Sequence, residues 1–334
     1  VKVTDPDGHV SRYTYDDAGN VLTFTDGTGS VTRYTYDKNN QLLTVTDATG
    51  AVTQYSYDAS GRKIKETNPL GNSTWYDYDE AGRLIAVTNA LGGVTRYAYD
   101  ANGRLIEQTL PDGSVWKTKY DSRGLEAGTI DSLGRETFVT RDDRGRVTAI
   151  KDASGAVTRY EYDLLDRNTK IINALGYETS YEYDALGNVR KIVDANHGET
   201  SFHYDPLGRL TGVTDALGHT TSYSYDAEGN LLTKTDALGN VTTYRYNKRN
   251  LAVESVNPLG EATVTAYDAV GNVSAVTAPD NTTTTYSYDA VHRLEQIVYG
   301  DGQRVSFTYD LAGRRIEMLD GSGLTRYTYD ALNR

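Results

Sequence analysis

Residues 208–226 read GRLTGVTDALGHTTSYSYD, and this stretch recurs with variations along the whole chain. It holds two short runs rich in Thr, Val and Tyr, which are separated by Asp215-Ala216-Leu217-Gly218 and closed by Tyr225-Asp226. Runs of β-branched and aromatic residues bounded by Asp and Gly are typical of β-strands joined by tight turns. No segment keeps a 3.6-residue apolar period long enough for a helix. The stretch therefore predicts one β-hairpin, and the chain as a whole predicts almost no helix.

The Tyr-Asp pair returns every 21 residues from Tyr15-Asp16 to Tyr309-Asp310 and closes one residue early at Tyr329-Asp330. Arg141 replaces the Tyr in one copy and Asn247 replaces the Asp in another, so sixteen copies fill the chain. We expect the Tyr, the Asp and the glycine three residues after the Asp to shape each hairpin. The structural motif residues predicted from the clearest copies are Tyr15, Asp16, Gly19, Tyr36, Asp37, Tyr57, Asp58, Gly61, Tyr78, Asp79, Gly82, Tyr99, Asp100, Gly103, Tyr183, Asp184, Gly187, Tyr204, Asp205, Gly208, Tyr225, Asp226 and Gly229.

The residues that replace turn glycines support this interpretation. Asp-x-x-Gly fits a type I turn whose last residue has a positive φ, a conformation that Gly, Asn, Asp and His tolerate best. The replacements are Asn40, Asp166, Asn250, His292 and Asn333 after the Tyr-Asp pair, and His197 and Asn281 in the second turn. The prolines stand at the second turn position, where a fixed φ is favourable: Pro6, Pro69, Pro111, Pro206, Pro258 and Pro279. The sequence predicts a positive φ at each replacement.

The aspartates at the first turn position have two interpretations. Asp or Asn there can accept a hydrogen bond from the backbone two residues on, or the aspartates can form a calcium ladder. Asn247 favours the turn role, because an amide makes that bond but is a weaker ligand for a hard cation.

Two strands per copy predict an all-β fold: an up-and-down antiparallel meander of about 32 short strands. Open sheets seldom pass about ten strands without curling, so we expect a curved wall or a hollow body. An eight-bladed β-propeller is the alternative, although it requires alternate copies to differ. The tyrosines two apart, such as Tyr34 and Tyr36, share one sheet face. We expect their rings to stack from copy to copy as a ladder that holds the wall together.

Composition excludes several classes of function. The chain has 334 residues, a net charge of −12 and no cysteine, which excludes disulfides, thiolate metal sites and a cysteine nucleophile. The negative charge argues against a nucleic-acid partner, and no apolar run is long enough for a membrane span.

No familiar catalytic motif occurs, so we predict no enzyme activity, no catalytic residue, no cofactor and no metal site. Each of the five histidines is expected to be structural or solvent-facing. Glycan recognition by the tyrosine-rich surface is kept as an alternative. The most degenerate copy, around residues 120–146, is interpreted as either sequence drift or a contact point.

The pattern Tyr-x-Tyr-Asp-x-x-Gly-Arg-Leu resembles the YD repeat, or Rhs repeat, family. That family includes Rhs polymorphic toxins, C components of insecticidal toxin complexes, wall-associated bacterial toxins and teneurins. Residues 78–84 (YDEAGRL) and 204–210 (YDPLGRL) fit the repeat position by position. The resemblance covers essentially the whole chain and implies a spiral β-sheet shell, or cocoon-like wall.

The resemblance also implies a function. It predicts a noncatalytic segment of a hollow cocoon that encloses a C-terminal toxin passenger, built as a single continuous array over residues 1–334 without separate domains. We expect this array to be an excerpt of a larger shell that is secreted or lies on the bacterial cell surface. The implied partners are the remaining shell and cap segments of the same polypeptide and the passenger, with a delivery-machinery protein or a surface glycan as further candidates. The competing hypothesis is a teneurin-like adhesion or carbohydrate-binding array.

Overall fold

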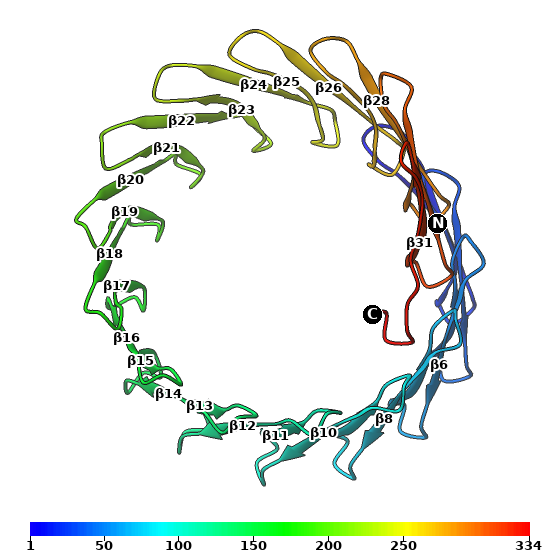
Figure 1. The fold of residues 1–334 in the computed structure, drawn as a ribbon, viewed down its shortest axis with the longest axis horizontal. Helices are drawn as coiled ribbons and strands as arrows, with labels where there is room; N and C mark the ends of the chain where they lie inside the picture. Colours follow the sequence, from blue (N-terminus) through cyan, green and yellow to red (C-terminus); the bar gives the residue numbers. More distant parts are fainter. The chain divides into compact units, whose positions relative to one another are not determined.

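The computed structural model describes all residues from 1 to 334 and contains 32 β-strands in one sheet and no helix. Strands that follow one another in the chain pair antiparallel (Figure 1). No pairing joins the first strand to the last, so the sheet is open. These observations confirm the predicted all-β meander.

The strands alternate between two lengths, because each repeat has one strand before and one strand after its second turn. The six-residue strands end at the Tyr of the pair or at Arg141: β2 (Val10–Tyr15), β4 (Val31–Tyr36), β6 (Val52–Tyr57), β8 (Ser73–Tyr78), β10 (Val94–Tyr99), β12 (Val115–Tyr120), β14 (Glu136–Arg141), β16 (Val157–Tyr162), β18 (Glu178–Tyr183), β20 (Glu199–Tyr204), β22 (Thr220–Tyr225), β24 (Val241–Tyr246), β26 (Ala262–Tyr267), β28 (Thr283–Tyr288) and β30 (Arg304–Tyr309).

The five-residue strands follow the turn after the pair: β3 (Val21–Thr25), β5 (Leu42–Thr46), β7 (Lys63–Thr67), β9 (Leu84–Thr88), β11 (Leu105–Thr109), β13 (Glu126–Ile130), β15 (Val147–Lys151), β17 (Asn168–Ile172), β19 (Val189–Val193), β21 (Leu210–Thr214), β23 (Leu231–Thr235), β25 (Ala252–Val256), β27 (Val273–Thr277) and β29 (Leu294–Val298). The ends of the sheet differ in length: β1 (Lys2–Thr4), β31 (Arg315–Asp320) and β32 (Gly323–Arg326).

The chain divides into two compact units. Unit 1 comprises Val1–Val94 and Thr243–Arg334, and unit 2 comprises Thr95–Thr242. In unit 2 every strand from β11 to β23 pairs with the next one, with no break after four strands. A propeller would interrupt this pairing at each blade boundary. The propeller alternative is therefore wrong.

Both turns of each repeat use the same hydrogen bonds. At Asp37, the backbone N–H donates to the carbonyl of Gln41, and the N–H of Asn40 donates to the carbonyl of Asp37. The Asp37 Oδ1 accepts from the backbone N–H groups of Asn39 and Gln41 at 2.8 and 2.9 Å. Asn247 Oδ1 accepts in the same way from Arg249 and Leu251, which confirms the predicted turn role of this position.

The predicted positive φ angles are also confirmed. All seven residues that replace a turn glycine have φ between 60 and 67°. The last second turn departs from the others, because Asp320 pairs directly with Gly323 across a two-residue connection. One residue fewer than in the other copies lies between Gly323 and the following Tyr-Asp pair, which accounts for the early closure of the period.

The sheet has almost no interior. Ala51 is the one buried hydrophobic residue, and no polar residue is buried. Side chains on the tyrosine face are mostly half-buried, whereas residues between them, such as Arg33 and Thr35, are exposed. The wall is held together by contacts between repeats and not by a packed core.

The predicted ladder of stacked rings is wrong. Ring-to-ring contacts within the units are limited to Tyr13 with Tyr15 and Tyr13 with Phe24. Equivalent tyrosines lie two strands apart, about 9.6 Å, which is beyond the range of ring stacking. Outside the Tyr13–Phe24 pair, the strand between them places an aliphatic or polar residue opposite such a tyrosine, as Val45 lies opposite Tyr34.

Candidate functional site

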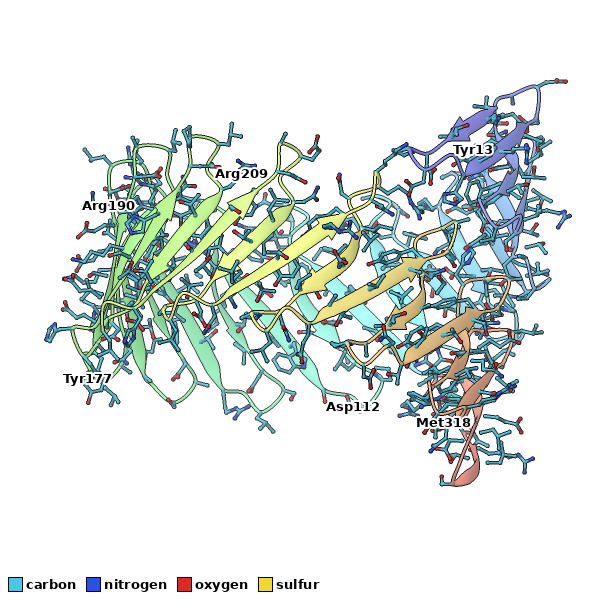
Figure 2. The ribbon with its side chains drawn as sticks, turned by 90° about the horizontal axis from the view of Figure 1, so that it is seen from above. Tyr13, Asp112, Tyr177, Arg190, Arg209 and Met318 are labelled. Carbon is cyan, nitrogen blue, oxygen red and sulfur yellow. The ribbon has the colours of Figure 1, made fainter.

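The turns form the two edges of the sheet, and these edges carry the contacts between repeats. We call the edge made by the turns after the Tyr-Asp pair the Tyr-Asp rim, and the edge made by the other turns the second-turn rim. Figure 2 shows the two edges in unit 2: Arg190 and Arg209 lie toward the Tyr-Asp rim, and Asp112 and Tyr177 toward the second-turn rim.

Of the two tyrosines that lie two residues apart, the one in the Tyr-Asp pair, here called the second-position tyrosine, fastens its strand to the preceding strand of the same hairpin. The Tyr57 hydroxyl donates to the carbonyl of Leu42, fifteen residues earlier, at 2.9 Å. The acceptor is the first residue of the preceding strand, which pairs antiparallel with the strand of the tyrosine across the second turn. The same contact is made by Tyr36, Tyr78, Tyr120, Tyr162, Tyr183, Tyr204, Tyr225, Tyr267, Tyr288 and Tyr309, and by Tyr329 over fourteen residues. Burial raises the pKa of several of these hydroxyls, including that of Tyr36.

Arg141 shows how a replacement keeps this contact. Its Nε donates to the carbonyl of Glu126, again fifteen residues earlier, at 3.3 Å. The copy with the most divergent sequence therefore retains the link between the two strands of its hairpin.

An arginine after the turn glycine makes the second link. Arg209 donates from Nε to Asp205 Oδ2 at 2.6 Å and from Nη1 to the carbonyl of Asp226, in the next Tyr-Asp turn, at 2.7 Å. Its guanidinium also lies 5.1 Å from the ring centroid of Tyr225. Equivalent contacts with the next ring are made by Arg62, Arg104, Arg146, Arg167, Arg293 and Arg314. A cation over an exposed ring contributes about 0.5–1 kcal/mol.

Where such an arginine is present, both carboxylate oxygens of the turn aspartate can be engaged. At Asp58, Oδ1 accepts from backbone N–H groups of its own turn, and Oδ2 accepts from Arg62 Nε at 2.6 Å. The hydrogen bond from the Arg62 backbone, with those from the Arg62 side chain and Ser60, holds the pKa of Asp58 below its ordinary value. This use of both carboxylate oxygens agrees with a structural role for the motif aspartates.

In unit 1 the first and last repeats of the chain lie beside each other (Figure 1). Arg249, in a Tyr-Asp turn, donates from Nε to Asp7 Oδ2, in a second turn, at 2.7 Å across 242 residues. Asn247 contacts the same carboxylate oxygen at 3.2 Å. One repeat further along, Gly27 meets Ala269 at the same sequence separation. We call this contact between the second-turn rim of the first repeats and the Tyr-Asp rim of the last repeats the seam.

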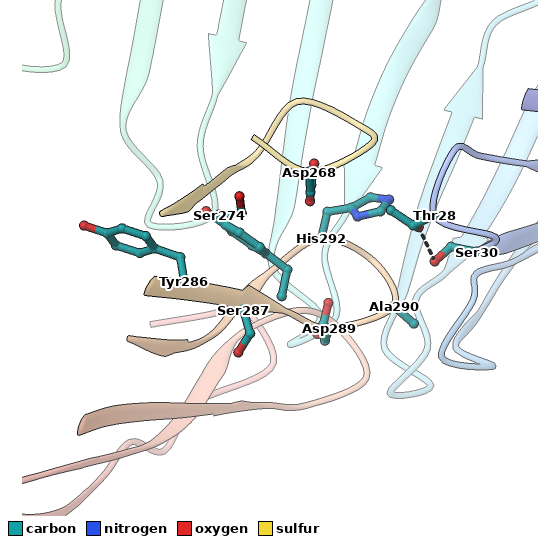
Figure 3. A pocket seen from close by; sticks show the side chains of 10 residues that line it. Thr28, Ser30, Asp268, Ser274, Tyr286, Ser287, Asp289, Ala290 and His292 are labelled. Carbon is teal, nitrogen blue, oxygen red and sulfur yellow. Dashed lines mark hydrogen bonds between the residues drawn. The ribbon is translucent and has the colours of Figure 1, made fainter. Parts of the chain in front are cut away.

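His292 adds a third seam contact. Its Nε2 lies 2.6 Å from Asp26 Oδ2, and its ring points toward Thr28 in the groove drawn in Figure 3. Burial raises the pKa of Asp26, but hydrogen bonds from Thr28, His292 and the turn backbone outweigh it and hold that pKa below its ordinary value. The groove runs between the turns at Asp268 and Asp289, and Thr28 and Ser30 line it from the first repeats.

The structure thus brings predicted motif residues of successive Tyr-Asp turns together. Arg62, for example, contacts both Asp58 and the ring of Tyr78. The seam residues Asp7, Asp26 and Arg249 were not singled out from the sequence. A signal was present, because Asn247, Asn250 and His292 depart from the repeat in the turns that form the seam. His292 was expected to be structural, and its contact with Asp26 agrees with that expectation.

No group of three or more acidic or histidine side chains has the arrangement of a metal site. The chain also lacks any helix that could cross a membrane. Carbohydrate binding remains a prediction.

The chain matches the RHS Repeat family over ten segments, several of which overlap: residues 1–31, 15–49, 36–73, 78–115, 99–136, 141–174, 167–200, 204–237, 225–262 and 267–304. Comparison with curated protein sequences gives no match.

Solved structures share the fold. A crystal structure of TcdB2-TccC3-Cdc42 superposes with a TM-score of 0.82 at 18% identity, covering 97% of this chain and 21% of that chain. A crystal structure of TcdB2-TccC3 gives 0.80 at 18% identity over 99% and 22% of the two chains. The Photorhabdus luminescens Tc holotoxin pore with the mutation TccC3-D651A gives 0.76 at 16% identity over 96% and 22%. The chain therefore spans about a fifth of the length of these similar chains. Since the repeat matches extend over most of its residues, the chain belongs to the RHS repeat family.

Proposed function

We propose that this chain is a noncatalytic wall segment of an RHS-type toxin shell that encloses a C-terminal toxin passenger. The observation that carries the proposal is the seam, where the second-turn rim of the first repeats lies against the Tyr-Asp rim of the last repeats. Contact between rims allows a sheet one layer thick to extend sideways into a wall. The fold shared with TcdB2-TccC3 supports the same proposal.

The mechanism we propose is confinement. A wall without a catalytic group acts by keeping its passenger away from other molecules until delivery. The excess of acidic residues, a net charge of −12, suits a basic passenger. These links suit a wall, since a hydroxyl-to-carbonyl bond holds the two strands of a hairpin together and an arginine bridge joins many of the successive Tyr-Asp turns.

The proposal extends to the setting of the chain. The sixteen repeats form one continuous array, and their partners are further shell and cap segments of the same polypeptide and the passenger. A delivery-machinery protein is a further partner. The assembly is secreted or displayed on the bacterial surface, in keeping with the Tc holotoxin named among the similar structures.

The test uses the polypeptide that carries this array together with its passenger. Limited proteolysis should leave the passenger intact in the native polypeptide and cleave it in an Arg249→Ala, His292→Asn variant whose seam is weakened. Folding of the variant is checked by circular dichroism. A passenger cleaved equally fast in both proteins would contradict confinement. Small-angle scattering on the isolated array is the companion measurement, and a compact solid profile would argue against a wall.

A further inference from the structure

At the seam, residues of both the first and the last repeats line a groove. Unit 2 contains the equivalent groove, which is lined from one side only. The seam groove is lined by Asp268, Ser274 and residues 286–290 of the last repeats, together with Thr28 and Ser30 of the first repeats. The unit 2 groove is lined by Asp184, Arg190 and residues 202–206. Each of these positions lies four repeats before its seam equivalent, so the two grooves are the same feature of the repeat.

The unit 2 groove has no second turn lying in it, and apolar side chains border it. Leu186, which lines it, and Leu207, in the turn that bounds it, are 72% and 76% exposed. At the seam the equivalent positions hold Val270, which is 36% exposed, and Val291, which is half-buried. Leaving two large leucines this exposed at adjacent turn tips is unfavourable, at about 25 cal/mol for each Å² of apolar surface. The groove therefore has the chemistry of a surface that is covered in an assembly.

The second-turn rim of unit 2 offers a matching element. The turn Asp236-Ala237-Leu238-Gly239 has the same position in the repeat as the turn of Asp26 at the seam, and Leu238 is 88% exposed. At the seam the aspartate of the equivalent turn, Asp26, contacts His292, whose equivalent in the unit 2 groove is Gly208, so the leucines at the turn tips would carry the proposed contact. The turn before Asp236 on this rim carries Leu217, which is 81% exposed, so adjacent turns present leucines at the repeat spacing.

We propose that the groove between the turns at Asp184 and Asp205 binds the second turn at Asp236 of another copy of this chain. The contact is heterologous, because a Tyr-Asp rim of one copy meets a second-turn rim of the other, and each copy keeps one free rim of either kind. Such contacts build open stacks or closed rings and not two-fold symmetric dimers. The inference concerns self-association and does not depend on the presence of a toxin passenger.

The seam supplies the geometry for a test. A Cβ atom added at Gly27 would lie 3.5 Å from the Cβ of Ala269, which is within the range of about 3.5–4.5 Å found in disulfides. The equivalent residues in the proposed contact are Ala237 in the turn and Ala185 in the groove. Because the chain contains no cysteine, single Ala185→Cys and Ala237→Cys variants each carry one thiol.

Mixing the two variants under mild oxidation should give a disulfide-linked dimer, whereas each variant alone should give far less. The Gly27→Cys, Ala269→Cys double variant is the positive control, and it should form its disulfide within one chain. Dimers that form as readily from Ala185→Cys alone would overturn the proposed pairing of unlike rims. The absence of a cross-link in the mixture, while the positive control forms, would overturn the contact itself.

Sedimentation velocity on the unmodified chain provides an independent measurement. We expect oligomers beyond the dimer that increase with concentration. The Leu186→Glu, Leu207→Glu variant should weaken association by about tenfold or more, since two apolar contacts become charged. Leu232→Glu, which adds a charge on a strand away from the groove, should leave association unchanged. A chain that stays monomeric at its highest soluble concentration, or equal effects of both variants, would contradict the proposal.

Discussion

The hydroxyl of the second-position tyrosine, the one in the Tyr-Asp pair, should contribute to the free energy of unfolding. The hydroxyl of the first-position tyrosine, two residues earlier, should not. The test replaces four second-position tyrosines of unit 2 with phenylalanine. They are Tyr120, Tyr162, Tyr183 and Tyr204, whose hydroxyls donate to carbonyls of the preceding strand at 2.9, 2.7, 2.5 and 2.8 Å. Phenylalanine keeps the ring and its packing, so only the hydrogen bond is removed.

The expected magnitude follows from the bond that is lost. A hydrogen bond of this kind contributes about 0.5–1.5 kcal/mol net, and the carbonyl left behind is in a half-buried environment. The four sites share no partner, and consecutive repeats are about 9.6 Å apart, so their effects should nearly add. We therefore expect the free energy of unfolding of unit 2 to fall by about 4 kcal/mol.

First-position tyrosines provide the matched control. Phe202 already occupies this position in one repeat. The hydroxyls of the four first-position tyrosines used for the control form no hydrogen bond. The control replaces Tyr97, Tyr160, Tyr181 and Tyr223 with phenylalanine, and it should change the free energy of unfolding by less than about 1 kcal/mol in total.

Urea unfolding followed by circular dichroism compares the two variants with the original chain. Because repeat arrays can unfold in parts, hydrogen exchange of residues 115–214 should accompany it. The second-position variant should lose protection in these strands, and the control should retain it. Equal destabilisation by both sets would refute the hydroxyl link and return the tyrosines to a role in ring packing alone. No effect of either set would refute the link as a source of stability.

Three further predictions concern the seam and the turns. Arg249→Ala removes the contact with Asp7, so hydrogen exchange in residues 1–31 should become about tenfold faster, while exchange in unit 2 stays the same. His292→Asn keeps the positive φ but loses the contact with Asp26, so the melting temperature should fall; His197→Asn, the same change at a turn away from the seam, should leave it unaltered. Backbone hydrogen bonds hold the pKa of many turn aspartates in the folded chain below its ordinary value. Their contribution to stability is therefore present above the pKa of the unfolded chain and is lost as the pH falls through the pKa of the folded chain. The urea midpoint should drop between about pH 5 and pH 3.

The features that could be predicted from the sequence are those decided within a few residues. The positive φ at Asn40 or His197 follows from the steric limits of one turn position, and the role of Asp37 follows from donors two and four residues away. The same residue preferences recur at each turn position in sixteen copies, which makes the prediction for any one turn firmer.

The side-chain contacts that join neighbouring strands and turns could not be predicted in the same way. The predicted ring ladder put tyrosines in contact with one another, whereas Tyr225 contacts the carbonyl of Leu210 and the guanidinium of Arg209. That outcome depends on the register of the sheet, which shifts by one residue just before each second-position tyrosine. The seam is still harder to predict from the sequence, because the pairing of Asp7 with Arg249 depends on the summed geometry of all the repeats between them.

The repeated residues are also the ones least able to carry a separate activity. In a typical copy both oxygens of the turn aspartate accept hydrogen bonds, the arginine bridges two repeats, and the tyrosine hydroxyl is bound to a carbonyl. A group already engaged in this way has little capacity left to bind a ligand or transfer a proton. What distinguishes one stretch of the wall from another must therefore lie where the copies differ, at turn tips such as Arg249, Leu186 and Leu238. If so, moving the turn tip of Arg249 to another Tyr-Asp turn should create a new preference for acidic second turns there, while exchanging tyrosines or aspartates between copies should change nothing.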